Sequence, residues 1–147
     1  MELGVHLPIV DLGAGEPSLR RMRDTVAAAR DCGFAAVSAN DHLVFARPWL
    51  DGPTALASVI DASAGLALAL TAALPVVRGP VALAKTLAAL DVLAGGRLVA
   101  ALAPGSSDGD HRAVGLDPAE RWARFDESLA VLRALLHGGP MPGHARH

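Results

Sequence analysis

The sequence is poor in residue types that define several other protein classes. Cys32 is the only cysteine among 147 residues, so no disulfide can form within the chain. This fits a reducing cytoplasm and excludes a disulfide-held secreted scaffold. The place of Cys32 late in an amphipathic segment predicts a small, buried side chain. Tyrosine is absent and aromatic residues make up 3% of the chain, which removes the stacking platform used by single-strand nucleic-acid binders.

Charge and long apolar runs are also limited. The sequence has thirteen Lys and Arg and fifteen Asp and Glu, which gives a net charge of -2. It contains no basic stripe, so we expect no nucleic-acid partner. Met1 to Val5 has no basic start of a secretory signal. The longest uncharged run, 62–77, contains Pro75 and is shorter than the roughly 18 to 20 apolar residues that a membrane span needs. We expect a cytoplasmic protein without membrane contact, and a buried strand within this run.

What the sequence does contain is a repeated β-then-α pattern. Apolar segments begin at Leu3, Ala35, Leu66 and Leu98, at intervals of 32, 31 and 32 residues. That interval is the length of one βα unit. The segments are apolar nearly throughout, as is typical of parallel strands that helices bury on both faces.

The stretches between these segments have the period of helices. The predicted helical faces are Leu19, Met22, Val26 and Ala29, ended by Gly33, and Leu83, Leu87, Leu90 and Ala94, with Pro80 in the first turn and Gly95-Gly96 at the end. A weaker helix is predicted over 54–63. The last helix is preceded by Asp117, Pro118 and Glu120, and its predicted buried stripe is Trp122, Phe125, Leu129, Leu132 and Leu136.

Four βα units define an α/β fold with two possible architectures. One is an open doubly wound sheet that binds a nucleotide, and the other is a TIM-barrel segment of about half a (β/α)8 barrel. A hydrophobic content of 52% is enough for one core. We expect one domain over residues 1–137, followed by a loop or disordered tail over 138–147 that is rich in Gly and Pro.

In both architectures ligands bind beyond the C-terminal ends of the strands. Asp41-His42 follows the second segment, and these are the predicted catalytic residues because histidine exchanges protons near neutral pH. The alternative is an Asx turn with a solvated histidine. The third and fourth segments end at Thr71, Ala72 and Ala73 and at Pro104, Gly105, Ser106 and Ser107.

Other motifs are weaker. Gly13-Ala14-Gly15 is a lone GxG, which is a poor signal for a phosphate or dinucleotide loop. His111, His137, His144 and His147 do not form a fixed set of ligands, so no metal site is predicted. Ser106-Ser107 lacks the nucleophile elbow of hydrolases.

The sequence resembles the N-terminal half of the bacterial luciferase-like monooxygenases and of their deazaflavin-dependent relatives. The resemblance extends along nearly the whole chain, through Cys32-Gly33-Phe34, Asn40-Asp41-His42, the block 70–97, Ala113-Val114-Gly115 and the segment 120–127. The long block is the most specific part. The resemblance implies a TIM barrel and an oxidoreductase, either a flavin-dependent monooxygenase or a deazaflavin-dependent hydride-transfer enzyme.

The resemblance also implies site residues and a cofactor, either flavin mononucleotide (FMN) or the deazaflavin coenzyme F420. Thr71, Ala72, Ala73, Pro104, Gly105 and Ser106 would contact the cofactor ring, with a bulge and a non-proline cis peptide matching Ala72-Ala73. Asp41 and His42 would face the ring or a small-molecule substrate, whose identity the sequence does not specify. The fourth segment ends Ala103-Pro104-Gly105-Ser106-Ser107, with fewer glycines than in relatives and without the acid that often follows there.

A half barrel has two unpaired sheet edges and an uncovered face, which soluble proteins must cover. We therefore expect a homo-oligomer or a separate C-terminal half-barrel as partner. The rival to an enzyme is a non-catalytic relative that serves as an assembly or ligand-binding module.

Overall fold

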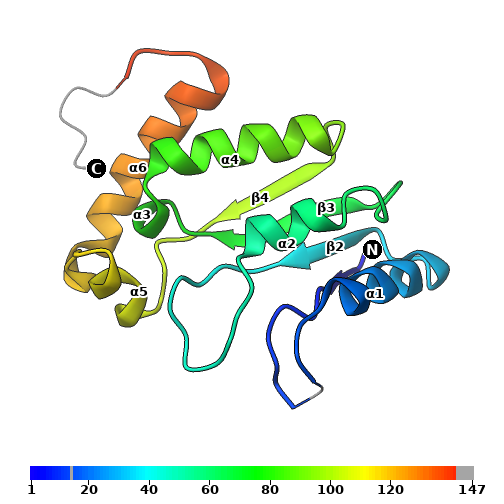
Figure 1. The fold of residues 1–147 in the computed structure, drawn as a ribbon. Coiled ribbons are helices and arrows are strands. Elements are labelled where there is room, and N and C mark those ends of the chain that lie inside the picture. The colour runs from blue at the N-terminus through cyan, green and yellow to red at the C-terminus, as the bar shows by residue number, and fades with distance from the viewer. Residues whose placement is uncertain (14, 142–147) are drawn as a thin grey trace.

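A computed structural model describes residues 1–13 and 15–141 and shows one parallel four-stranded sheet (Figure 1). The strands are β1 (Gly4–His6), β2 (Ala36–Ala39), β3 (Ala67–Ala73) and β4 (Leu98–Leu102), and they pair in the order β1-β2-β3-β4. All three neighbouring pairs are parallel. The four predicted strands and their parallel pairing are confirmed, and each strand is the spatial neighbour of the next in sequence.

The helices alternate with the strands as predicted. They are α1 (Leu19–Asp31), α2 (Gly52–Ser58), α3 (Pro75–Arg78), α4 (Pro80–Leu93), α5 (Asp108–Ala113) and α6 (Arg121–His137), with a 3-10 turn η1 (Pro118–Glu120) before α6. The hydroxyl of Ser18 caps α1, and Asp117 caps η1. Two short helices, α3 and α5, were not predicted, and α2 begins earlier and ends earlier than the expected 54–63.

Helices cover one face of the sheet, as expected of a half barrel, so the expectation that helices bury both faces of the strands was wrong. Burial alternates along β2 and β3. The buried side chains Val37, Ala39, Leu68 and Leu70 belong to one core with residues of α1, α2 and α4, including Val26, Leu56, Leu83 and Leu87. The opposite, inner face carries mainly small residues that are not fully buried: Gly4, His6, Ala36, Ser38, Ala67, Ala69, Thr71, Val99 and Ala101.

Two side-chain predictions were wrong. Cys32 is exposed because it lies at the C-cap of α1, beyond the buried face of that helix. On α6 the buried residues are Ser128, Val131 and Leu132, whereas Trp122 is 65% exposed and Leu136 is also exposed. The helix packs mainly against α3 and α4, and these contacts bury only a narrow stripe of it.

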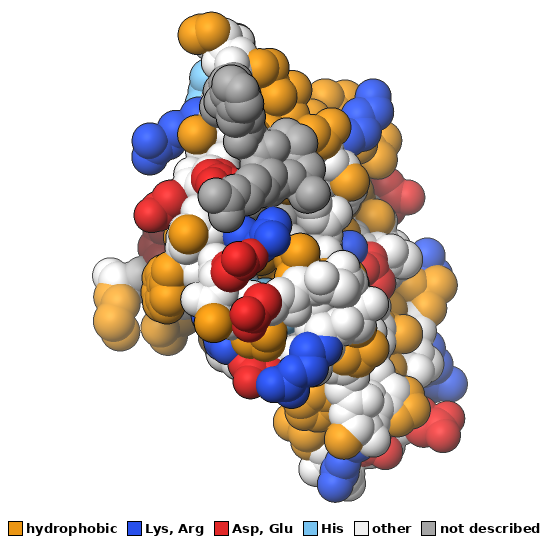
Figure 2. Space-filling model, turned by 90° about the vertical axis from the view of Figure 1, so that its left-hand side faces the viewer, with side chains coloured by type: hydrophobic (Ala, Val, Ile, Leu, Met, Phe, Trp, Pro, Cys, Tyr) orange, Lys and Arg blue, Asp and Glu red, His pale blue; other side chains and the backbone are white. Residues whose placement is uncertain are grey.

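One face of the molecule carries charges of both signs. On the side that carries α5 and α6, basic side chains are separated by acidic and hydrophobic ones (Figure 2). Within the described residues, each helix is too short or too polar to span a bilayer.

Gly52 allows the start of α2 to lie against the end of β2. A Cβ at this position would be 2.3 Å from the Asn40 carbonyl oxygen and 3.1 Å from Leu70 Cδ1. We predict that Gly52→Ala lowers the free energy of unfolding by about 1 to 3 kcal/mol, since the backbone must shift to relieve the overlap. Urea denaturation measures this change.

Gly109→Ala is the matched control. It places a Cβ in α5 at 3.4 Å or more from its neighbours, and alanine favours a helix more than glycine does. A Gly52→Ala protein as stable as Gly109→Ala would show that the contact between α2 and β2 is loose.

Candidate functional site

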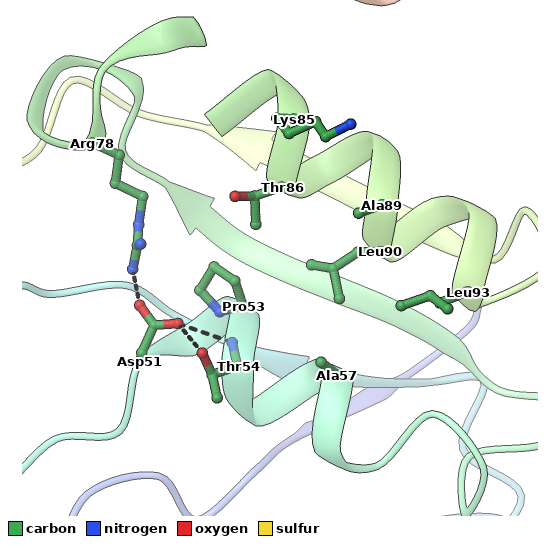
Figure 3. Close-up of a pocket in the computed structure, with 10 residues that line it drawn as sticks. All are labelled: Asp51, Pro53, Thr54, Ala57, Arg78, Lys85, Thr86, Ala89, Leu90 and Leu93. Carbon is green, nitrogen blue, oxygen red and sulfur yellow. Dashed lines mark hydrogen bonds and ion pairs between the residues drawn. The ribbon is translucent and has the colours of Figure 1, made fainter. Parts of the chain in front are cut away.

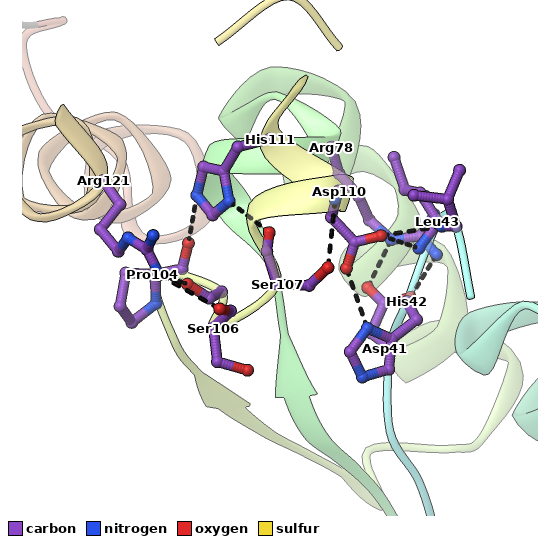
Figure 4. Close-up of polar contacts among 12 residues, drawn as sticks. Asp41, His42, Leu43, Arg78, Pro104, Ser106, Ser107, Asp110, His111 and Arg121 are labelled. Atoms are coloured by element: carbon purple, nitrogen blue, oxygen red, sulfur yellow. Dashed lines mark hydrogen bonds and ion pairs between the residues drawn. The ribbon is translucent and has the colours of Figure 1, made fainter. Parts of the chain in front are cut away.

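The loops after β2 and β4 are joined at the C-terminal edge of the sheet by a buried carboxyl group (Figure 4). Asp110 in α5 is fully buried, and its Oδ2 is 2.8 Å from Nδ1 of His42. Its Oδ1 accepts the backbone N–H groups of Leu43 at 3.1 Å and Val44 at 2.7 Å. One carboxylate therefore fixes both the His42 ring and the first turn of its loop.

This bond defines the tautomer of His42. A carboxylate oxygen can only accept, so Nδ1 of His42 carries the hydrogen, and in the neutral imidazole Nε2 is left with its lone pair. The His42 side chain is 20% exposed, so Nε2 is available to a ligand. The predicted catalytic histidine is thus oriented by a partner, as a general base must be.

Asp110 was missed in the sequence because only residues directly beyond each strand were considered. Its signal was local: the hydroxyl of Ser107 caps α5 and accepts the N–H of Asp110 at 3.2 Å. A serine followed three residues later by an acid is a helix-start pattern. Asp110 supplies an acid near the strand ends, which the fourth segment itself lacks.

Asp41 lies in a different network. It is 4% exposed, and its two oxygens accept from Nε and Nη2 of Arg78, both at 2.5 Å. Arg78 also donates to Asp51, the N-cap residue of α2. Both carboxyl oxygens of Asp41 are therefore bonded to protein, and this pair ties the end of β2 to α3 and α2.

The network changes the pKa values of Arg78 and Asp51, and both changes favour the charged forms. Hydrogen bonds from Arg78 to Asp41 and then to Asp51, opposed by burial, raise the pKa of Arg78. Burial opposes ionisation of Asp51, but hydrogen bonds from Thr54 and Arg78 outweigh it and lower the pKa of Asp51. Arg78 stays cationic and Asp51 anionic at neutral pH, so the network is an ion-paired support for the site.

The structure divides the predicted cofactor residues into two groups. Thr71 is exposed, and Ala72, Pro104 and Ser106 are at least partly accessible. Ala73 is fully buried on the helix side. Gly105 is buried at φ 89°, where a Cβ would lie 3.0 Å from Cε1 of His111.

The expected bulge is present, but its cis peptide lies one residue earlier than predicted. The register with β4 shifts between Thr71 and Ala73, and the cis bond joins Thr71 to Ala72. The expectation of Ala72-Ala73 was wrong by one position.

The remaining motifs have structural roles. The amides of Gly13 and Gly15 donate to Oδ1 of Asp11 at 2.8 and 3.1 Å, so this loop binds its own carboxylate. Buried His111 lies with Nδ1 2.8 Å from the Ser107 carbonyl and Nε2 3.1 Å from that of Pro104. No group of three or more metal-ligating side chains occurs among the described residues; His144 and His147 lie outside them.

A cavity of about 390 Å³ lies between α2 and α4, among the covering helices (Figure 3). Arg78 and Asp51 stand at one end of it, and Ala57, Ala89 and Leu93 at the other. None of the predicted site residues lines it, so it is separate from the candidate site.

Comparisons with known proteins agree with this geometry. Among solved structures, monooxygenase RslO1 from Streptomyces bottropensis superposes with a TM-score of 0.76 at 27% identity, covering 91% of this chain and 42% of RslO1. The FMN-bound oxygenating constituent of 3,6-diketocamphane monooxygenase from Pseudomonas putida gives 0.74 at 19% identity, covering 92% and 39% of the two chains. An F420-dependent secondary alcohol dehydrogenase, in complex with an F420-acetone adduct, gives 0.76 at 18% identity, covering 90% and 41%.

The chain spans about two fifths of the length of these enzymes, and the two more distant ones show the shared fold. The structure is therefore a partial TIM barrel. A search of curated protein sequences gives no match. The profile of the luciferase-like monooxygenases matches residues 1–147, and the chain belongs to this family.

Proposed function

We propose that this chain is the part of a flavin- or deazaflavin-dependent oxidoreductase barrel that carries its proton-handling residue, His42. The observation that carries the proposal is the bond from His42 to buried Asp110 at the strand ends, which leaves Nε2 free. A histidine oriented in this way can accept or deliver a proton next to a bound substrate. The family and the FMN- and F420-dependent neighbours support an oxidoreductase.

The residues at the strand ends fit a flat cofactor ring. Thr71, Ala72, Pro104 and Ser106 have short side chains and are accessible, so a ring can approach the backbone closely. Asn40, at the end of β2, has a buried Oδ1 without a hydrogen-bond partner, which a ring N–H would satisfy. When bound, the ring would supply the hydride or oxygen chemistry.

The chain's own residues would position the substrate and exchange a proton with it. His42 holds or moves a proton at Nε2, and Asp110 keeps the ring of His42 in the required tautomer. Asp41 was predicted as catalytic, but its two bonds to Arg78 favour a positioning role at the base of the loop. Breaking such a buried pair costs about 3 to 5 kcal/mol.

A second half would complete the barrel. Within residues 1–13 and 15–141, β1 and β4 each have one unpaired edge, and the inner face of the sheet is uncovered. In TIM barrels the phosphate site usually lies after strands seven and eight. We propose that a second copy or a separate C-terminal half-barrel supplies those strands and binds the cofactor phosphate.

The rival function is a non-catalytic assembly or ligand-binding module. The observation in its favour is that Asp41, one of the two residues predicted to be catalytic, is fully engaged by Arg78. An enzyme of this kind needs His42 for turnover, whereas a binding module does not.

We predict that His42→Asn lowers turnover of reduced flavin or reduced deazaflavin, in the completed assembly, by about 100-fold or more, since general acid-base catalysis contributes that much. His137→Asn at the end of α6 is the control and should retain activity. Asp110→Asn should displace the pH profile of the remaining activity, because the His42 ring loses its negatively charged acceptor. Equal turnover in His42→Asn and wild type would favour the module.

We further predict that the 147-residue chain alone binds FMN weakly, because the phosphate-binding loops are on the other half. Fluorescence titration with FMN, combined with sedimentation analysis of the same sample, measures both affinity and size. Tight one-to-one binding by a monomer would contradict the need for a second half.

A further inference from the structure

The loop that follows β2 contains an aromatic cluster beside the candidate catalytic histidine. The ring centroids of His42 and Trp49 are 4.8 Å apart, those of His42 and Phe45 5.3 Å, and those of Phe45 and Trp49 4.6 Å. Residues 42–49 line a cavity of about 460 Å³. Since the whole sequence has five Phe and Trp residues, two of them in this one loop are a marked concentration.

The loop is held at both ends. At its start, Asp110 accepts the N–H groups of Leu43 and Val44. At its end, Trp49 forms an antiparallel bridge with Val10, and the Leu50 N–H donates to the Ile9 carbonyl at 2.8 Å. A cavity whose walls are fixed before binding loses little entropy when a ligand enters.

The cavity combines ring faces with an unused acceptor nitrogen. Phe45 is 50% exposed, which leaves apolar ring surface for stacking. Nε2 of His42 is free as described above, whereas Nε1 of Trp49 is buried, so the Trp49 indole contributes its ring and not its N–H. Arg47 also lines the cavity, and its Nη1 donates to the Asp11 carbonyl at 3.0 Å. Ring faces beside an acceptor nitrogen fit a flat ring that carries a hydroxyl group.

We propose that the loop 42–49 is a substrate subsite for planar ring compounds with a hydroxyl substituent, such as phenols. Their ring would stack on Phe45 and Trp49, and their hydroxyl group would donate to Nε2 of His42. The assignment of the ligand as a substrate rests on the proposed function, whereas its binding does not. The test therefore measures binding in the absence of flavin.

The test is a titration of the ¹⁵N-labelled chain with 2-naphthol, followed by NMR of the indole N–H signals. The chain has two tryptophans, and Trp122→Phe assigns the signals. The Trp49 signal should move in a saturable way, and that of Trp122, on α6, should not. Decahydro-2-naphthol, with the same hydroxyl on a saturated ring, should bind weakly or not at all.

Phe45→Leu should weaken 2-naphthol binding about threefold to tenfold, the worth of one aromatic pair. Phe125→Leu is the matched control, because Phe125 pairs with Trp122 at 6.3 Å outside the cavity, and it should leave binding unchanged. A Trp49 signal that does not move in the wild-type chain overturns the proposal without any variant. Equal binding of the saturated compound also overturns it, as does displacement of 2-naphthol by FMN, which would assign the cavity to the cofactor.

Discussion

The arrangement of the candidate site depends on the carboxyl group of Asp110. It is fully buried, and all its described partners except its own helix cap come from the loop after β2. An uncompensated buried carboxylate is costly, so the three donors and the acid stabilise one another. These bonds orient His42 and hold the first turn of the loop that carries the aromatic cluster. The ion pairs of Arg78 with Asp41 and Asp51 support the same loop from the other side.

The second constraint is that helices cover only one face of the sheet within the described residues. The helices bury one face of β2 and β3, while the inner face of mainly small residues and the edges of β1 and β4 have no cover within the described part of the chain. Such a surface is stable in water only when another element covers it. The site at the strand ends and the proposed complementary half are thus based on the same geometry.

Much of the fold could be predicted from the sequence, because the 31- to 32-residue interval and the helical periods are local signals. The burial of α6 could not be predicted. Its helical period shows an apolar stripe, but it does not show which neighbouring elements cover that stripe. Burial on both faces was inferred because the strand residues are apolar. The inner face consists largely of alanines, which are apolar whether or not they are covered, so the composition could not reveal the uncovered face. At the site, the position of His42 was predictable from the strand ends. Its bond to Asp110, 68 residues away, requires the packing of α5, and the bidentate capture of Asp41 by Arg78 requires α3.

The most direct test of this account is the tautomer of His42 in the folded chain. Long-range ¹H–¹⁵N NMR correlations of the imidazole, recorded over a pH series and read where the ring is neutral, distinguish the two ring nitrogens. The account predicts a hydrogen on Nδ1 and a bare Nε2, and the reverse tautomer in the Asp110→Asn protein or a mixture of both. A wild-type His42 with its hydrogen on Nε2 would contradict the account, because Asp110 would then not orient the ring.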